Sequence, residues 1–329
     1  MEIVPGIHQL KLPIPFSISE EIGKIVAETN VYLIEGDTGW LLVDTGWDDP
    51  RTFKVFEEEI KRIGIDFQDI SQIIVTHFHY DHLGLAGKLR QLSGAKVALH
   101  QKESRFIELR DIPKEQRVKV MKDWLSKNGF PENEIPDYVF SMEMESPDIY
   151  FSGGEKIGTG LFNFEVMWTP GHSPGHICLY ERAKRLLLSG DHLIAEITPD
   201  ISALPLLVSN PLKDYLNSLR DLRKLDVELV LPGHGNHFDY FKRRIDEIIQ
   251  HHQKRKGVIL DILKDGPLVA YEIASRVPWI PQQGGIPWQS LDFFNRQMAL
   301  METLAHLEFL EEEEKIKKVT APDYWKRNE

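Results

Sequence analysis

The pattern of apolar and polar residues divides the first part of the chain into short strands and amphipathic helices. Two apolar runs, 31–34 and 40–43, flank a turn sequence at 36–39 that contains two glycines, which favours a hairpin. Residues 7–12 predict an earlier strand. Residues 52–63 place apolar side chains on one helical face, and residues 83–92 predict a second helix.

Four further apolar runs are each followed by a loop that begins with glycine or polar residues. They cover residues 73–75, 164–168, 185–188 and 227–231, and each has the length and apolar character of a buried strand. Binding and catalytic residues concentrate on loops at the rim of a rigid sheet. The residues that follow these four runs are therefore the first candidates for a functional site.

The loop after the first of these runs holds four metal-ligand side chains within six residues: His77, His79, Asp81 and His82. Neutral imidazole and carboxylate are the ligands of zinc and its first-row neighbours, so such crowding suggests a cation between them. The alternative is a polar loop with surface histidines. It is disfavoured because the other three loops hold candidates of the same kind, namely His172, Asp191 and His234.

These motifs resemble those of the metallo-β-lactamase superfamily, over roughly residues 1–250. The likeness is carried by the His-x-His-x-Asp-His motif at 77–82, by the three later ligand candidates, and by an upstream Val-Asp-Thr-Gly motif at 43–46. The resemblance implies an α/β fold, an αββα sandwich of two mixed sheets with helices outside and a metal site along one edge. It implies that His77, His79 and His172 bind one metal, that Asp81, His82 and His234 bind a second, and that Asp191 bridges both.

The ligand set is similar to that of the glyoxalase II and lactonase branches of this superfamily. True β-lactamases of the superfamily carry Cys where this chain has Asp191, and the diiron flavoproteins carry Glu where it has His79. The likeness therefore implies a dinuclear hydrolase that uses a metal-bridging hydroxide on a thioester, lactone or other ester, with Asp81 and Asp191 as catalytic residues. A single-stranded RNA nuclease of the same superfamily and an iron-dependent oxygenase are the alternatives.

Two divalent ions suit hydrolysis because a bound metal lowers the pKa of water from 15.7 to about 7. Zinc is the expected metal, and iron or manganese fits a His/Asp ligand set almost as well. Asp44 is the first candidate for the outer acceptor that fixes a ligand histidine, because a carboxylate just past a buried strand must be paired. Its alternative role is to cap a turn or helix. His176, four residues after His172, is expected to support the ligands through hydrogen bonds.

The pattern divides the chain into a catalytic domain over 1–250 and a C-terminal domain over 251–329. Residues 101–140 predict a helical insertion within the first domain. In the second, helices over 258–263, 270–277 and 291–310 and a strand over 316–320 have the order of a winged helix. Apolar residues recur every three or four positions on its long helix, at Leu300, Leu304, Leu307 and Leu310, and predict a buried stripe in the domain itself or in a homodimer.

Charge and composition restrict the partners of the chain. Its 329 residues carry a formal net charge of −12, which disfavours general binding to nucleic acid. The second domain holds 11 Lys and Arg against 12 Asp and Glu, whereas a DNA-binding domain should be basic. We therefore expect a small-molecule ester or thioester as the partner, and no membrane. Cys178 is the only cysteine, and no secretion signal is evident, so a cytoplasmic location is expected.

Overall fold

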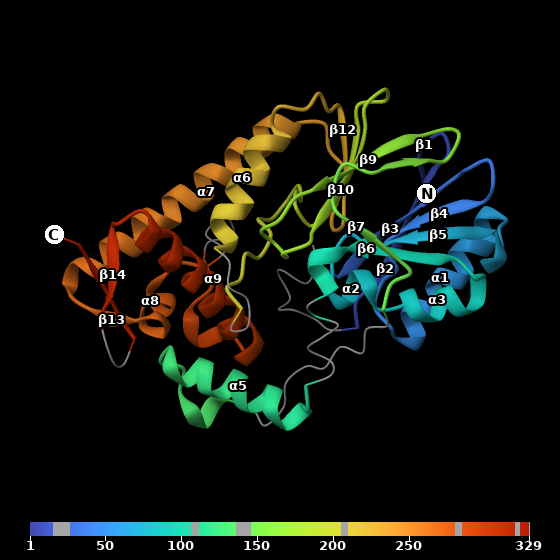
Figure 1. Ribbon diagram of the computed structural model, residues 1–329. Coiled ribbons are helices and arrows are strands. Elements are labelled where there is room, and N and C mark those ends of the chain that lie inside the picture. The colour runs from blue at the N-terminus through green and yellow to red at the C-terminus, as the bar shows by residue number, and fades with distance from the viewer. Residues whose placement is uncertain are drawn as a thin grey trace. The chain divides into compact units, whose positions relative to one another are not determined.

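The computed structural model describes residues 1–15, 27–104, 106, 112–135, 146–204, 210–279, 285–319 and 323–328 (Figure 1). Parts of the expected insertion, at 105, 107–111 and 136–140, lie outside this range, as does Thr320 at the end of the last expected strand. The chain forms two compact units. Unit 1 comprises Met1–Asp111, Met142–Pro199 and Ser218–Ile245, and unit 2 comprises Ile112–Ser141, Asp200–Asn217 and Asp246–Glu329.

Unit 1 contains a sheet in which seven strands can be followed through the described residues. Its strands lie in chain order: β1 (Glu2–Val4), β2 (Ile7–Pro13), β3 (Glu28–Ile34), β4 (Trp40–Val43), β5 (Ile70–Ile74), β6 (Lys96–His100) and β7 (Ile149–Phe151). Strands β1 to β4 pair antiparallel, and β4 to β7 pair parallel. The sheet is thus mixed, and the hairpin predicted around residues 36–39 joins β3 to β4.

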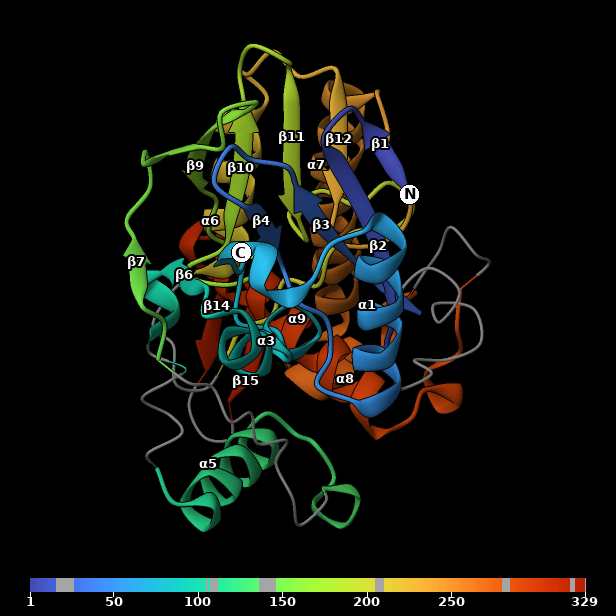
Figure 2. The ribbon, with the colours of Figure 1, turned by 90° about the vertical axis from the view of Figure 1, so that its right-hand side faces the viewer.

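A second sheet of unit 1 has the order β12-β11-β10-β9-β8 in the described part of the chain (Figure 2). The bounds are β8 (Lys156–Gly158), β9 (Asn163–Trp168), β10 (Ile177–Glu181), β11 (Leu186–Gly190) and β12 (Leu229–Pro232). Only its β11–β12 pair is parallel among these strands. Ile34 and Ile74 of the first sheet share one buried core with Val166 and Leu188 of the second. The two sheets therefore form the expected sandwich.

The helix expected over 52–63 is α1 (Pro50–Ile63), which packs on β2. Asp49 caps its first turn by accepting a hydrogen bond from the Arg51 backbone, and Pro50 occupies a position that requires no amide donor. Gly64 ends it in the left-handed conformation. The prediction of this helix is confirmed.

The helix expected over 83–92 is confirmed from Ala86 onward, as α3 (Ala86–Ser93), but its start is wrong, because Leu83 ends a separate short helix, α2 (Tyr80–Leu83). The backbone amide of Leu85 donates to the Gly46 carbonyl at 3.1 Å instead of continuing the helical ladder. A Cβ at Gly84 would lie 2.5 Å from the Asp48 nitrogen, so the loop after β4 approaches the chain too closely for any side chain there. The interruption ends α2, which carries Asp81 and His82.

Unit 2 is built mainly from helices. The helices with residues in this unit are α5 (Lys114–Lys127), α6 (Pro211–Leu222), α7 (Phe241–Ile262), α8 (Ala270–Arg276) and α9 (Phe293–Glu312). A small antiparallel sheet has the order β13-β15-β14 among the described residues, with β13 (Leu268–Val269), β14 (Ile316–Val319) and β15 (Tyr324–Arg327). The helix expected over 258–263 is confirmed: residues 258–262 complete α7, and Leu263 lies in the short turn of helix that follows.

The expected insertion, from residue 112 onward, belongs to the same compact unit as the C-terminal segment. The Asn128 carbonyl accepts from the Tyr271 amide at 3.0 Å, and Arg296 pairs with Glu134 at 2.8 Å. The leucine stripe of α9 is buried within the chain itself, on a helix that contacts α8 and β14. The expected boundary at residue 250 falls inside the continuous helix α7, and the winged-helix assignment stays a prediction.

Among the described residues, no helix combines the length and apolar character needed to cross a bilayer.

Candidate metal centre

The structure brings the seven ligand candidates of the sequence to one place in unit 1. Each comes from a loop that follows a strand: β5 precedes the 77–82 cluster, β9 precedes His172, β11 precedes Asp191, and β12 precedes His234. Two groups of side chains could each hold an ion, with donor atoms within 4.8 Å of one another. The first group is His77, His79, His172 and Asp191, and the second is Asp81, His82 and His234.

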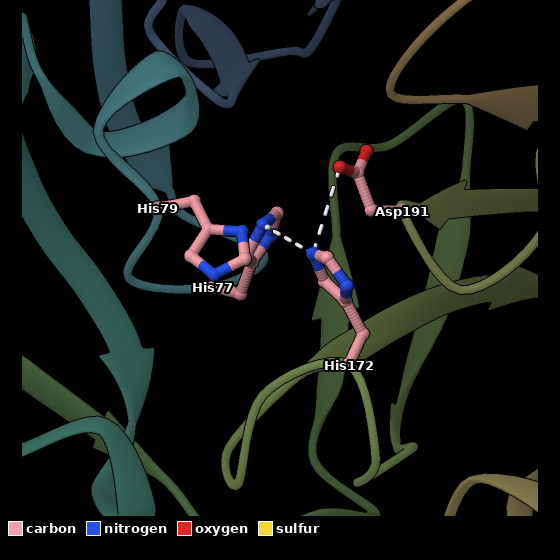
Figure 3. A group of neighbouring side chains, drawn as sticks. All are labelled: His77, His79, His172 and Asp191. Carbon is pink, nitrogen blue, oxygen red and sulfur yellow. Dashed lines mark hydrogen bonds and ion pairs between the residues drawn. The ribbon is translucent and has the colours of Figure 1, made fainter. Parts of the chain in front are cut away.

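The first group converges from both sheets of the sandwich (Figure 3). The Nε2 atoms of His77 and His172 are 3.2 Å apart, and His172 Nε2 lies 3.6 Å from Asp191 Oδ2. His79 approaches from the same loop as His77, and the two rings meet edge to face. Three imidazoles and one carboxylate therefore present their donors to a common point.

The second group is equally tight. His234 Nε2 lies 3.1 Å from Asp81 Oδ2, and His82 Nε2 lies 3.3 Å from His234 Nε2 and 3.5 Å from Asp81 Oδ2. Imidazole nitrogens and carboxylate oxygens at these separations suit a shared cation.

Asp191 faces both groups. Its Oδ1 lies 3.4 Å from His82 Nε2, while its Oδ2 lies 3.3 Å from His234 Nε2 and 3.6 Å from His172 Nε2. Oδ1 is buried and has no hydrogen-bond partner among the described residues. A buried carboxylate oxygen without a donor is costly. A metal ion beside it would remove that cost, so the residues present fit the metals that the ligand set implies.

Room for Asp191 depends on a glycine in the neighbouring loop. A Cβ at Gly233 would lie 2.3 Å from Asp191 Oδ1 and 2.8 Å from the His82 ring. The glycine in the sequence Leu-Pro-Gly-His before His234 therefore allows the chain to pass directly behind the ligands.

Asp44 holds two ligand histidines in a defined orientation. It lies at the end of β4 with φ 63°, and its Oδ2 is 2.8 Å from His82 Nδ1. The Thr76 amide donates to its Oδ1 at 2.7 Å, and the Thr76 hydroxyl donates to its Oδ2 at 2.9 Å. With its proton on Asp44, that hydroxyl accepts from His77 Nδ1, 2.9 Å away. Both histidines are then protonated at Nδ1, and each Nε2 keeps its lone pair for a metal.

His234 and His176 are fixed by similar contacts. His234 Nδ1 donates to the Glu28 carbonyl at 2.9 Å, which again leaves Nε2 for an ion. His176 lies behind Asp191: its Nδ1 is 2.9 Å from the Thr169 hydroxyl, and its Nε2 accepts from the Asp191 amide at 3.2 Å. His176 therefore supports the backbone of the shared carboxylate and lies outside both ligand groups.

Burial and neighbouring charges shift the pKa values in opposite directions within the centre. Burial lowers the pKa of His77 far below its usual value and that of His79 to about 3, and neighbouring imidazoles add to both shifts. Burial opposes protonation of His234 as well, but the charges and hydrogen bonds of Asp191 and Asp81 together outweigh it and raise that pKa to about 10. The pKa of Asp191 is lowered because attraction to His234 and His82 outweighs its burial. The carboxylates thus stay ionised, with a strong demand for positive charge.

Glu103, beyond the end of β6, is a supporting residue that the sequence reasoning missed. It is fully buried, and its Oε1 accepts from the Ser173 hydroxyl and, at 2.8 Å, from the Gly175 amide. Burial raises its pKa to about 8, although these hydrogen bonds oppose the shift. It thereby ties the loop that carries His172 to the first sheet. A single acid after a predicted strand gave no distinguishing signal.

Residues 26–234 of the chain match the family model described as the Metallo-beta-lactamase superfamily. The chain is similar to a Bacillus subtilis (strain 168) protein named "Probable metallo-hydrolase YqjP", with 26% identity across 97% of this chain and 95% of the relative. It is also similar to the human protein named "Acyl-coenzyme A thioesterase MBLAC2", with 28% identity across 68% of this chain and 78% of that protein.

Among solved structures, a metallo-beta-lactamase family protein from Thermus thermophilus matches 99% of this chain and 100% of its own. The TM-score is 0.82 at 29% identity. A beta-lactamase domain protein from Burkholderia ambifaria has a TM-score of 0.78 at 24% identity, over 99% of this chain and 94% of that protein, and so shares the fold.

Proposed function

Because the chain belongs to the metallo-beta-lactamase superfamily and is a metal-dependent hydrolase, we propose that its centre binds two metal ions and hydrolyses thioesters of the acyl-coenzyme A type. The observation that carries the dinuclear part is the position of Asp191, whose two oxygens face donors of both ligand groups.

His77, His79 and His172 would hold one ion, Asp81, His82 and His234 would hold the other, and Asp191 would serve both. Zinc is the metal that we assign, because imidazole and carboxylate ligands suit it. Bound divalent metals supply a nucleophile at neutral pH by lowering the pKa of water, and they polarise the carbonyl oxygen of an ester.

The remaining work is done by side chains of this protein. Asp44 and the Thr76 hydroxyl hold His82 and His77 in the tautomers that ligation requires. Asp81, whose pKa stays low because attraction to His82 and His234 outweighs its burial, provides an ionised oxygen that can accept a hydrogen bond from attacking water. The Thr29 hydroxyl donates a long hydrogen bond to Asp81 Oδ2, at 3.5 Å, and helps to orient that carboxylate.

The thioester assignment rests on the relative named as an acyl-coenzyme A thioesterase, and on charge. A formal net charge of −12 opposes the approach of an RNA backbone, which carries one negative charge per nucleotide. Acyl-coenzyme A also carries phosphates, but it is a small ligand, so a few local basic side chains suffice for it where RNA requires an extended basic surface. The nuclease alternative therefore has less support than the thioesterase.

The assignment is tested by comparing substrates on one preparation. Zinc-loaded protein is incubated with short- and long-chain acyl-coenzyme A, with a simple lactone and with single-stranded RNA. We expect thiol release from acyl-coenzyme A that stops after treatment with a chelator and returns when zinc is restored. Cleavage of the lactone or the RNA without thioester hydrolysis would overturn the substrate assignment.

The number of metal ions in the centre is tested separately by elemental analysis. The variant used is His252→Ala, which removes a buried histidine of α7 outside the centre and leaves all seven proposed ligands in place. Two equivalents per chain support the dinuclear centre. One equivalent at saturating zinc contradicts it.

A further inference from the structure

A second cluster of histidines lies in unit 2, on α7 and α9 (Figure 1). His251 and His252 of α7 and Glu302 of α9 place one donor atom each within 4.8 Å of one another. His306, one turn after Glu302, completes what we term the α7–α9 cluster. The seven residues of the metal centre belong to unit 1, so the cluster takes no part in the function proposed above.

A chain of hydrogen bonds defines the tautomers of this cluster. His306 Nδ1 donates to the Glu302 carbonyl at 2.8 Å, which leaves its Nε2 as an acceptor. His252 Nδ1 lies 3.2 Å from that Nε2 and therefore carries the proton that joins the two rings. His252 Nε2 is then unprotonated, and its lone pair points away from His306. An outer acceptor at Nδ1 with a free Nε2 is the arrangement of a metal-ligating histidine.

The lone pair of His252 has no partner within the described chain. The residue is fully buried, and its Nε2 makes no hydrogen bond there. A buried acceptor without a hydrogen-bond donor is costly, so a metal cation bound at this nitrogen would stabilise the site.

The charges around the cluster leave room for a cation. Glu302 accepts from Arg255 at Oε1, 2.6 Å away, and its second oxygen keeps acceptor capacity. Lys256 is paired with Glu313. A further carboxylate, Asp200, lies close enough that burial and the charge of Glu302 raise its pKa to about 7. Lys256 and Glu313 neutralise each other, which leaves Glu302 and Asp200 near the single guanidinium of Arg255.

We propose that His251, His252 and Glu302 form a second metal site, for a zinc-class divalent cation, that joins α7 to α9. Two imidazoles and one carboxylate are a common protein ligand set for zinc and for ferrous iron. The ion would occupy the position toward which the His252 lone pair is directed. Its role would be structural, because it would link two helices of unit 2 across the Arg255–Glu302 ion pair.

The test counts zinc on the full-length protein. Protein stripped with a chelator is saturated with zinc chloride, freed of excess by gel filtration and measured by elemental analysis. We expect three equivalents per wild-type chain and two in His252→Ala. Glu302→Gln, which keeps the shape of the side chain, should also bind two. Gln253→Ala, on the exposed face of the same helix, should bind three.

The outcomes separate this proposal from the proposed function. Equal zinc contents in wild-type, His252→Ala and Glu302→Gln proteins overturn the second site, whatever that number is. A fall from two equivalents to one supports the second site and contradicts a dinuclear centre in unit 1. If His252→Ala fails to fold, as judged by circular dichroism, Glu302→Gln decides the question.

Discussion

In unit 1 seven donors reach one place from four loops, whereas on α7 and α9 three donors come from two helices. Each strand-end loop of the metal centre can bring its residue inward independently. Adjacent residues on a helix, such as His251 and His252, point in directions about 100° apart. Both can therefore reach one ion only if it lies between these two directions, beside α7. The loops thus favour a crowded site with high coordination, and the helices favour a sparse one.

The two regions also differ in how their carboxylates are used. Asp191 is shared between two groups of histidines, and its Oδ1 has no hydrogen-bond donor in the described chain. Glu302 is already neutralised in part by Arg255. A metal in unit 1 therefore meets an uncompensated charge, whereas a metal at α7–α9 competes with a guanidinium. We expect the unit 1 ions to bind more tightly.

The largest expected effect comes from removing the shared carboxylate. Asp191→Ala takes a ligand from both proposed ions, and metal catalysis contributes several kcal/mol, so thioester hydrolysis should fall by at least about a thousand-fold. His176→Ala removes the acceptor of the Asp191 amide and the ring partner of the Thr169 hydroxyl but no proposed ligand, and it should cost about ten-fold. The measurement is kcat/KM at saturating zinc. Equal losses in the two variants would contradict the supporting role of His176 and would mean that it acts as a metal ligand.

A smaller effect is expected at Asp44, which orients the ligands without touching an ion. Asp44→Asn tolerates the left-handed backbone but replaces an acceptor oxygen with an amide donor, so it cannot satisfy both Thr76 and His82. We expect zinc affinity of the unit 1 site to fall by about 10- to 100-fold. Competition with a chromophoric chelator measures it. Asp49→Asn, at the exposed cap of α1, should leave affinity unchanged, and a loss there as large as that at Asp44 would contradict a specific role.

The fold class, the superfamily and the hydrolase class predicted from the sequence are confirmed. They were predictable because the motifs at the strand ends are local in sequence. The residue types and spacing of the 77–82 loop are enough to indicate metal ligands. The role of each ligand stays a prediction that the geometry supports. The sequence predicted that Asp44 accepts a hydrogen bond from a ligand histidine, but it did not identify that histidine as His82.

Other features depend on contacts between distant segments and could not be predicted. The division of the 83–92 helix results from the Gly46 carbonyl reaching Leu85. Glu103 acquires its role from Ser173 and Gly175, about seventy residues away. The α7–α9 cluster depends on contact between residues of α7 and α9 that are about fifty positions apart in the sequence. Local pattern carries no information about such partners.

The smallest effect is expected from Glu103→Gln, which preserves an acceptor for Ser173 and Gly175 but cannot ionise. The pKa of Glu103 rises from 4.5 to about 8 on folding, so the folded wild type holds a proton that the unfolded chain has lost between these values. Wild-type stability therefore falls as pH rises from about 4.5 to 8. The Gln variant escapes this loss. At pH 9 its free energy of unfolding should exceed that of wild type by at least on the order of 1–2 kcal/mol.

Urea unfolding of both proteins at pH 5 and pH 9, with zinc saturating, measures this difference, and comparing variants cancels the pH dependence of metal binding. Glu155→Gln is the matched control in the same unit. Glu155 accepts from the Ser152 and Gly153 amides, and although burial opposes it, these hydrogen bonds lower its pKa. The ionised form of Glu155 thus stabilises the fold above its unfolded pKa. The Gln variant should therefore become less stable relative to wild type as pH rises. A pH-independent difference at Glu103 would mean that the carboxyl is already ionised in the fold, and the His172 loop would then be held by a charge-assisted contact.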